Sequence, residues 1–259
     1  MLLAIDVGNT NIVIGLFEGT NLLANYRLHT NWQVTADEIA LDIQGLLAMR
    51  GWSLSSIKGM VLGCVVPPLV YPLTRFADRY LQLAPLVVGP GTKTGIPILL
   101  DNPKELAADL IANAVGAQAR FGAPVIVVDF GTATTFSAIS ARGEYAGAVI
   151  APGMKMALEA LFLQTAKLPR VEIVEPRRVI GKNTVEAMQS GIFIGFIGLA
   201  AEIIHRMQDD LGHLTPVVAT GGLSVSIGPF IPSIGTIEPN LTLEGLRIIF
   251  ERNYPAPSS

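Results

Sequence analysis

A hairpin built around an Asp-x-Gly turn occurs twice in this chain and constrains its fold more than any other feature. Residues 2–17 read LLAIDVGNTNIVIGLF, and residues 125–139 read VIVVDFGTATTFSAI. In each copy an apolar strand runs into Asp-x-Gly, a short turn rich in small polar residues, and a second apolar strand. One copy alone is compatible with an ordinary glycine turn. Two copies favour two similar half-domains that bind one nucleoside triphosphate between them.

The residue types of these turns suit a polyphosphate. Glycine lets backbone N–H groups approach phosphate oxygens closely, and the Thr and Asn side chains add further donors. A carboxylate beside a polyanion requires a cation, so the Asp of each turn implies metal, held directly or through water. Neither copy fits the Gly-x-x-x-x-Gly-Lys-Ser/Thr loop or the Gly-x-Gly-x-x-Gly dinucleotide turn.

Composition excludes several other classes of protein. The 259 residues are 50% hydrophobic and 15% charged, which is enough for one large domain or two small ones. A net charge of −3 without a basic run gives no electrostatic case for nucleic acid. The single cysteine, Cys64, excludes an internal disulfide, and three scattered histidines make a His metal cage or a Ser-His-Asp triad improbable.

The chain is expected to be cytoplasmic, with no membrane partner. Its N-terminus reaches Asp6 without a basic lead, unlike a signal peptide. The longest apolar stretch, residues 192–204, is shorter than a bilayer span and predicts a buried helix.

The expected order of elements is β-β-β-α-β-α-β in each half, which is half of an actin-like, or ribonuclease-H-like, duplicated α/β fold with mixed sheets. We expect an N-terminal half over residues 1–113 and a C-terminal half over residues 114–259. The best helix start is at Thr35, with Glu38 at the capping-box position. The expected helices span residues 35–49, about 69–83, 102–120, 183–209 and 241–253, with further helices after Pro152-Gly153; the expected strands beyond the hairpins span residues 21–29, 59–66, 85–88, 146–150 and 217–220.

Further motifs lie between and beyond the hairpins. They are Thr94-Gly95-Ile96-Pro97, Asp101-Asn102-Pro103-Lys104-Glu105 with Asp109, Ile150-Ala151-Pro152-Gly153, Lys167-Leu168-Pro169, Gly181-Lys182-Asn183-Thr184 and Ala219-Thr220-Gly221-Gly222. Together with the two hairpins, and in this order, they resemble the type III pantothenate kinases over nearly the whole chain. The resemblance implies a homodimer that phosphorylates pantothenate with ATP, the opening step of coenzyme A biosynthesis. It also implies Mg²⁺ and a monovalent cation, K⁺ or NH₄⁺.

The resemblance further implies residue roles. Asp109 is the base that takes the proton of the pantothenate hydroxyl, Asp129 holds the monovalent cation, and Asp6 holds Mg²⁺ through water. The apolar surroundings of Asp109 agree with a functional carboxylate, because an uncompensated one would be costly there. The implied ATP-binding residues are Asp6, Val7, Gly8, Asn9, Thr10, Asn11, Ile12, Val13, Gly131 and Thr132, and the implied substrate-binding residues are Leu100, Ala107, Ala108, Asp109, Leu110 and Thr184.

The chain departs from the family where the acceptor binds. The usual Gly-Ala-Asp-Arg reads Ala107-Ala108-Asp109-Leu110, so an arginine is replaced by leucine. A lost charge-assisted contact costs about 1.5–3 kcal/mol. Three hypotheses therefore stay open: a pantothenate kinase, a catalytically weak nucleotide-binding paralogue with a regulatory or partner-binding role, and a kinase for a less polar acceptor.

Overall fold

The computed structural model describes residues 1–255 and divides into two compact units. The first unit comprises Met1–Ala119 together with the C-terminal segment from Leu241, and the second comprises Arg120–Asn240. The boundary expected between residues 113 and 114 thus differs from the observed boundary between Ala119 and Arg120, although both fall inside helix α3 (Ala108–Phe121). The closing helix α7 (Leu241–Asn253) belongs to the first unit because it packs on strands of the sheet of that unit.

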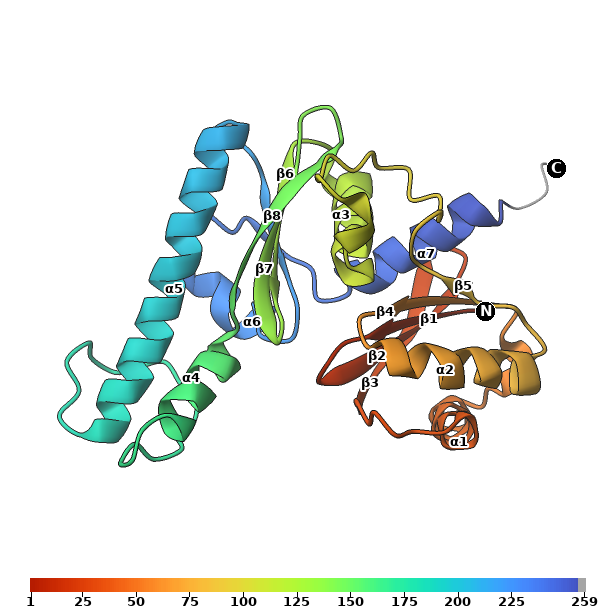
Figure 1. Ribbon diagram of the computed structural model, residues 1–259, viewed down its shortest axis with the longest axis horizontal. Helices are drawn as coiled ribbons and strands as arrows, with labels where there is room; N and C mark the ends of the chain where they lie inside the picture. The colour runs from red at the N-terminus through yellow and green to blue at the C-terminus, as the bar shows by residue number, and fades with distance from the viewer. Residues whose placement is uncertain (256–259) are drawn as a thin grey trace. The chain divides into compact units, whose positions relative to one another are not determined.

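The first unit is built on a five-stranded sheet in the order β3-β2-β1-β4-β5. Strand β1 pairs antiparallel with β2 and parallel with β4. Helices α1 and α2 cover one side of this sheet, and α7 covers the other (Figure 1). The elements are β1 (Leu2–Val7), β2 (Asn11–Glu18), β3 (Asn21–His29), α1 (Ala36–Ala48), η1 (Leu54–Ser56), β4 (Gly59–Cys64), η2 (Pro67–Leu69), α2 (Val70–Phe76), η3 (Ala77–Leu81), β5 (Leu86–Val87), η4 (Pro103–Glu105), α3 and α7.

Local sequence explains the start of α1. The Thr35 hydroxyl accepts the Glu38 N–H at 3.3 Å, and the Glu38 carboxylate accepts the Thr35 N–H at 2.8 Å, which confirms the predicted capping box. Ile39, Ile43 and Leu47 follow at helical spacing and are buried against the sheet.

The second unit repeats the arrangement of the first. Its five-stranded sheet has the order β10-β9-β6-β7-β8, so each sheet pairs a meander of three antiparallel strands with two parallel strands. This equivalence confirms the predicted duplication. The elements are β6 (Val125–Phe130), β7 (Ala133–Ile139), β8 (Tyr145–Pro152), α4 (Met154–Leu163), α5 (Thr184–Leu211), β9 (Val217–Thr220), α6 (Ser224–Ile227), η5 (Gly228–Phe230) and β10 (Thr236–Ile237).

The helix expected over residues 102–120 is interrupted. Asn102 does cap a helical turn, since its side chain accepts the Lys104 N–H, but that turn is the short 3₁₀ helix η4. Leu106 is extended, with ψ of 117°, and this ends the turn before α3 begins at Ala108. Asp109 therefore lies in the first turn of a new helix rather than in the middle of a long one.

Helix α5 is less buried than predicted. Asn183 caps it as expected, but side chains along it remain open, including Ile194 at 39% and Leu199 at 36% exposure. By length and composition alone, α5 is the single helix within residues 1–255 that could cross a membrane, and the core helix of a globular protein passes the same test. The apolar stretch of residues 192–204 lies within this longer helix.

Candidate active site

The first Asp-x-Gly turn lies where the parallel strands β1 and β4 end. Asp6 is half-buried near the end of β1, and the Gly8 N–H closes the turn by donating to the Asn11 carbonyl at 3.0 Å. Asn9 and Thr10 at the tip are exposed. The turn thus presents polar groups outward, as phosphate binding requires. The other residues predicted to bind ATP here flank the turn on the two strands: Val7, Ile12 and Val13.

Asp109 lies above the same strands, at the start of α3. A Cβ added to Gly63, the register partner of Asp6, would lie 3.8 Å from the Cβ of Ala108. The structure therefore brings Asp6 and Asp109 into one neighbourhood of the first unit. The Asp109 carboxylate accepts the Leu110 N–H at 2.8 Å and has no ion-pair partner among residues 1–255. Burial raises the pKa of Asp109 above the ordinary aspartate value, against the opposing effect of that hydrogen bond.

Helix α7 fixes the position of α3. A Cβ added to Gly245 would lie only 1.8 Å from the Ala112 carbonyl oxygen, so the two helices are in backbone contact. The Thr242 hydroxyl donates to the buried Asn113 side chain at 2.7 Å and adds a polar contact beside this crossing. Since Asp109 lies one turn before Ala112, the placement of α7 determines where the Asp109 carboxylate stands.

The two residues that depart from the family motif around Asp109, Ala107 and Leu110, lie in mostly enclosed positions. Leu110 is 8% exposed, as is Ala108, which matches the motif, and Ala107 is half-buried just before α3. Leu100 is half-buried in the preceding loop. The leucine at position 110 thus contributes to the core of the first unit, and its presence leaves no exposed apolar side chain at this helix start.

The second Asp-x-Gly turn joins β6 to β7. Asp129 near the end of β6 is the register partner of Thr220 on β9, so both side chains project from the same face of the sheet. The Thr220 side chain is fully buried, and within the described chain its hydroxyl has no hydrogen-bond partner. Gly221 has φ of +89°, and a Cβ there would lie 2.3 Å from the Asp129 carboxylate. A buried hydroxyl and a carboxylate thus converge beside the turn of Gly131 and Thr132.

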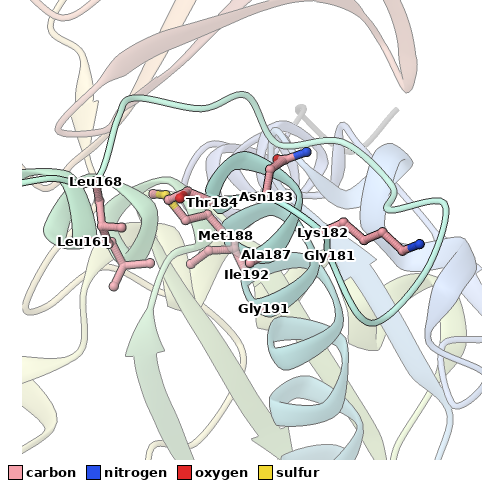
Figure 2. A pocket seen from close by; sticks show the side chains of 10 residues that line it. All are labelled: Leu161, Leu168, Gly181, Lys182, Asn183, Thr184, Ala187, Met188, Gly191 and Ile192. Carbon is pink, nitrogen blue, oxygen red and sulfur yellow. The ribbon is translucent and has the colours of Figure 1, made fainter.

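Thr184 belongs to a different part of the second unit. It is the first residue of α5 and lines a surface hollow of about 680 Å³ between α4 and α5. In Figure 2, Thr184 and Met188 lie in the middle of the hollow, with Leu161 of α4 on one side and Lys182 on the other. The hollow therefore combines apolar walls with a polar helix start.

The start of α5 is held by a polar network. The Asn183 side chain accepts the Glu186 N–H at 2.9 Å. The Glu186 carboxylate accepts the Lys182 N–H at 3.0 Å and pairs with Arg178 at 2.8 Å. These bonds, the one from the Lys182 backbone most of all, lower the pKa of Glu186. The ionised carboxylate thus joins the loop before α5 to the helix start that carries Thr184.

Two features of the site depend on strand pairing and were not predicted. One is the Thr220 hydroxyl opposite Asp129, for which the only sequence signal was its place before Gly221-Gly222. The other is the Thr30 hydroxyl, which donates to the Gly8 carbonyl at 2.7 Å. Nothing in the local sequence around Thr30 indicated this contact.

The single cysteine is not suited to act as a nucleophile. Burial raises the pKa of the Cys64 thiol, which donates to the Val66 carbonyl, so this cysteine is a poor nucleophile. No group of three or more His, Cys, Asp or Glu side chains that could hold a metal ion occurs in the described part of the chain.

Solved structures share this fold. The ethanolamine utilization protein EutJ from Carboxydothermus hydrogenoformans superposes with a TM-score of 0.54 at 14% identity, covering 95% of this chain and 89% of that one. The activator of 2-hydroxyisocaproyl-CoA dehydratase from Clostridium difficile, with bound ADPNP, gives a TM-score of 0.52 at 12% identity and covers 100% and 98%. The chain accordingly has the actin-like fold of ATPases and sugar kinases, as its sequence predicted.

Sequence comparison narrows this class. A family model described as "Type III pantothenate kinase" matches residues 2–206. Relatives of that name from Moorella thermoacetica and Myxococcus xanthus are 54% and 49% identical, and each alignment covers 98% of this chain and 100% and 99% of the relative. The chain belongs to the type III pantothenate kinases and is therefore an enzyme of the kinase class.

Proposed function

We propose that the chain phosphorylates pantothenate with ATP to give 4'-phosphopantothenate, the first step of coenzyme A biosynthesis. The observation that carries this proposal is the half-buried Asp109 carboxylate on a helix start above the first Asp-x-Gly turn, in a chain that matches the family almost end to end. The weak-paralogue hypothesis is not favoured, because the chain aligns at up to 54% identity with relatives of that name over their full length.

Asp109 orients the acceptor hydroxyl and takes its proton. Burial raises the pKa of Asp109, which makes its carboxylate a better base than that of an exposed aspartate. Most of the remaining catalysis in phosphoryl transfer is positioning and charge neutralisation. The acceptor side is completed by Leu100, Ala107, Ala108 and Leu110.

Each unit carries one Asp-x-Gly turn that suits the phosphates of ATP. The ATP-binding residues are residues 6–13 in the first unit and Gly131 and Thr132 in the second. Asp6, half-buried at a strand end beside exposed donors, fits an Mg²⁺ ion held through water. When bound, Mg²⁺ neutralises charge on the phosphates.

Asp129 and Thr220 suit a monovalent cation. The fully buried Thr220 hydroxyl without a partner, facing a carboxylate from the next strand, offers the oxygen ligands that a hard cation requires. We assign K⁺ or NH₄⁺ to this position. The cation supplies positive charge near the second phosphate-binding turn.

The enzyme acts as a homodimer through its second unit, and Thr184 contacts pantothenate. Large apolar side chains are exposed on that unit, including Ile150 at 68% on the edge strand β8, and Val179 at 69% and Ile180 at 82% on the loop before α5. Such a concentration of exposed apolar side chains is typical of an interface between copies. A second copy accounts for the open side of α5 without a membrane, and we place the enzyme in the cytoplasm with no nucleic-acid partner.

The test of activity is coupled ADP release with ATP, Mg²⁺ and K⁺, with and without pantothenate. We expect pantothenate-dependent turnover that Asp109→Asn abolishes. Absence of such turnover in the folded wild-type protein would refute the proposal. The double variant A107G/L110R separates it from the paralogue hypothesis, which requires that this variant gain an activity the natural chain lacks.

The test of assembly is light scattering on Ile150→Glu beside the wild type. The wild type should give twice the mass of one chain and the variant the mass of a single chain.

The cation assignment is tested by omitting K⁺ and NH₄⁺, which should abolish turnover. Full activity in sodium buffer alone would refute the assignment.

A further inference from the structure

A residue outside the predicted site holds the first phosphate-binding turn. Thr30 directly follows β3 and is 6% exposed. Its hydroxyl donates to the Gly8 carbonyl at 2.7 Å, and its backbone N–H donates to the Thr10 carbonyl at 3.0 Å. We infer that Thr30 is a positioning residue that keeps this turn in its ATP-binding shape, an inference that rests on the proposed role of the turn.

Peptide geometry links these two bonds to the phosphate side of the turn. Each peptide unit is planar and trans, so its N–H points opposite to its C=O. With the carbonyls of Gly8 and Thr10 directed at Thr30, the N–H groups of Asn9 and Asn11 point away from it. Thr30 thus orients donors that it does not itself touch, and it leaves no carbonyl of these two units facing a phosphate.

Thr30 is held to the turn by one side-chain bond and one backbone bond. The residues on either side of it, His29 and Asn31, are exposed and line a cavity of about 190 Å³ between the sheet and α1, whereas Thr30 itself is 6% exposed and does not line that cavity. Of these two bonds, only the hydroxyl bond to the Gly8 carbonyl can be removed by a substitution, since the backbone bond to Thr10 is independent of side-chain type.

The chain supplies a matched control in Thr215. This threonine is 3% exposed, and its hydroxyl also donates to a glycine carbonyl, that of Gly212, at 2.7 Å. It lies between α5 and β9 in the second unit, outside both Asp-x-Gly turns. Thr→Val at either position removes one buried hydroxyl bond of equal length while keeping the side-chain shape.

The experiment compares Thr30→Val, Thr30→Ser, Thr215→Val and the wild type in the full chain. Affinity for the Mg²⁺ complex of a non-hydrolysable ATP analogue is measured by calorimetry without pantothenate, and the KM for each substrate and the melting temperature are measured beside it. Thr30→Val should weaken analogue binding and raise the KM for ATP about three- to tenfold, the usual effect of one hydrogen bond. The KM for pantothenate should stay within about twofold, Thr30→Ser should bind as the wild type does, and Thr215→Val should only lower the melting temperature.

Two results would overturn the inference. One is wild-type affinity of folded Thr30→Val for the analogue, and the other is an equal loss of affinity in Thr215→Val. Should Thr30→Val not fold, Thr30→Ser against Thr30→Ala gives the same comparison of hydroxyl with no hydroxyl. A further variant, Thr10→Val, tests the turn itself. If Thr10→Val weakens analogue binding and Thr30→Val does not, the positioning role of Thr30 is refuted while the ATP-binding role of the turn stands. If neither variant changes binding, the proposed ATP-binding role of the turn is refuted as well.

Discussion

The contact between α3 and α7 makes a sharp prediction for Gly245→Ala. A Cβ at this position would lie 1.8 Å from the Ala112 carbonyl oxygen, whereas real Cβ atoms essentially never approach a heavy atom closer than 3.0 Å. The helices must therefore separate by about 1.2 Å or distort locally. Overpacking of this kind costs about 1–3 kcal/mol, which lowers the melting temperature of a chain of this size by roughly 2–10 °C.

The same displacement should reduce catalysis, because Asp109 lies one turn before Ala112. A misplacement of about 1 Å costs up to roughly 100-fold in rate. We expect kcat to fall by about that factor at saturating ATP and pantothenate, measured by coupled ADP release at a temperature well below unfolding. Gly45→Ala in α1, where an added Cβ meets no atom within 4 Å, is the control and should be neutral or stabilising. Wild-type stability and kcat in Gly245→Ala would refute the tight crossing.

Three further predictions concern charge and the second unit. Burial raises the pKa of Asp109, so the folded state binds this proton more tightly than the unfolded chain, and ionising the carboxyl costs stability as pH rises through the raised pKa. Calorimetry should therefore show inactive Asp109→Asn melting above the wild type at neutral pH, with the difference in melting temperature closing towards about pH 4. Equal melting temperatures at every pH would contradict this. Hydrogen bonds from Lys182 and Arg178 lower the pKa of Glu186, so the stabilisation that its carboxylate gives the start of α5 is present at neutral pH and lost as pH falls through that lowered pKa. Glu186→Gln should raise the KM for pantothenate at neutral pH without changing the KM for ATP. An unchanged KM for pantothenate would count against the Thr184 site. Gly221→Ala places a methyl against the Asp129 carboxylate at a positive φ, so the K⁺ concentration for half-activation should rise about tenfold or more, and a wild-type K⁺ titration would argue against cation binding there.

The fold could be predicted from the sequence wherever short-range signals decide it. The capping box at Thr35, the Asn183 cap and the extent of α7 each depend on residues a few positions apart, and all three are observed. The prediction of one continuous helix from Asn102 was wrong because the local signal there did not determine the type or the length of the helix. An Asn cap followed by Pro starts a 3₁₀ turn as readily as an α-helix, and the extended Leu106 that ends the turn carries no local signal.

The two Asp-x-Gly turns could be located from the sequence, whereas the residues that contact them could not. The Asp-x-Gly pattern identifies both phosphate-binding candidates because glycine and aspartate are required at fixed short spacings. Thr30 and Thr220 meet their partners across strands, at separations that only the register of the sheets defines. The consequence of Leu110 likewise needed the structure, because burial in the core cannot be distinguished by spacing from an exposed pocket wall.

The return of α7 to the first unit has a consequence for synthesis of the chain. The second unit is one continuous stretch, Arg120–Asn240, whereas the first is completed only by the segment from Leu241. Because a ribosome releases the chain from its N-terminus, the strands of the β1–β5 sheet emerge before the second unit, and helix α7, which covers one side of that sheet, emerges only after the second unit. A chain truncated after Asn240 should accordingly lose its first unit to limited proteolysis while residues 120–240 resist. The half of the enzyme that is made first is thus the half that finishes folding last.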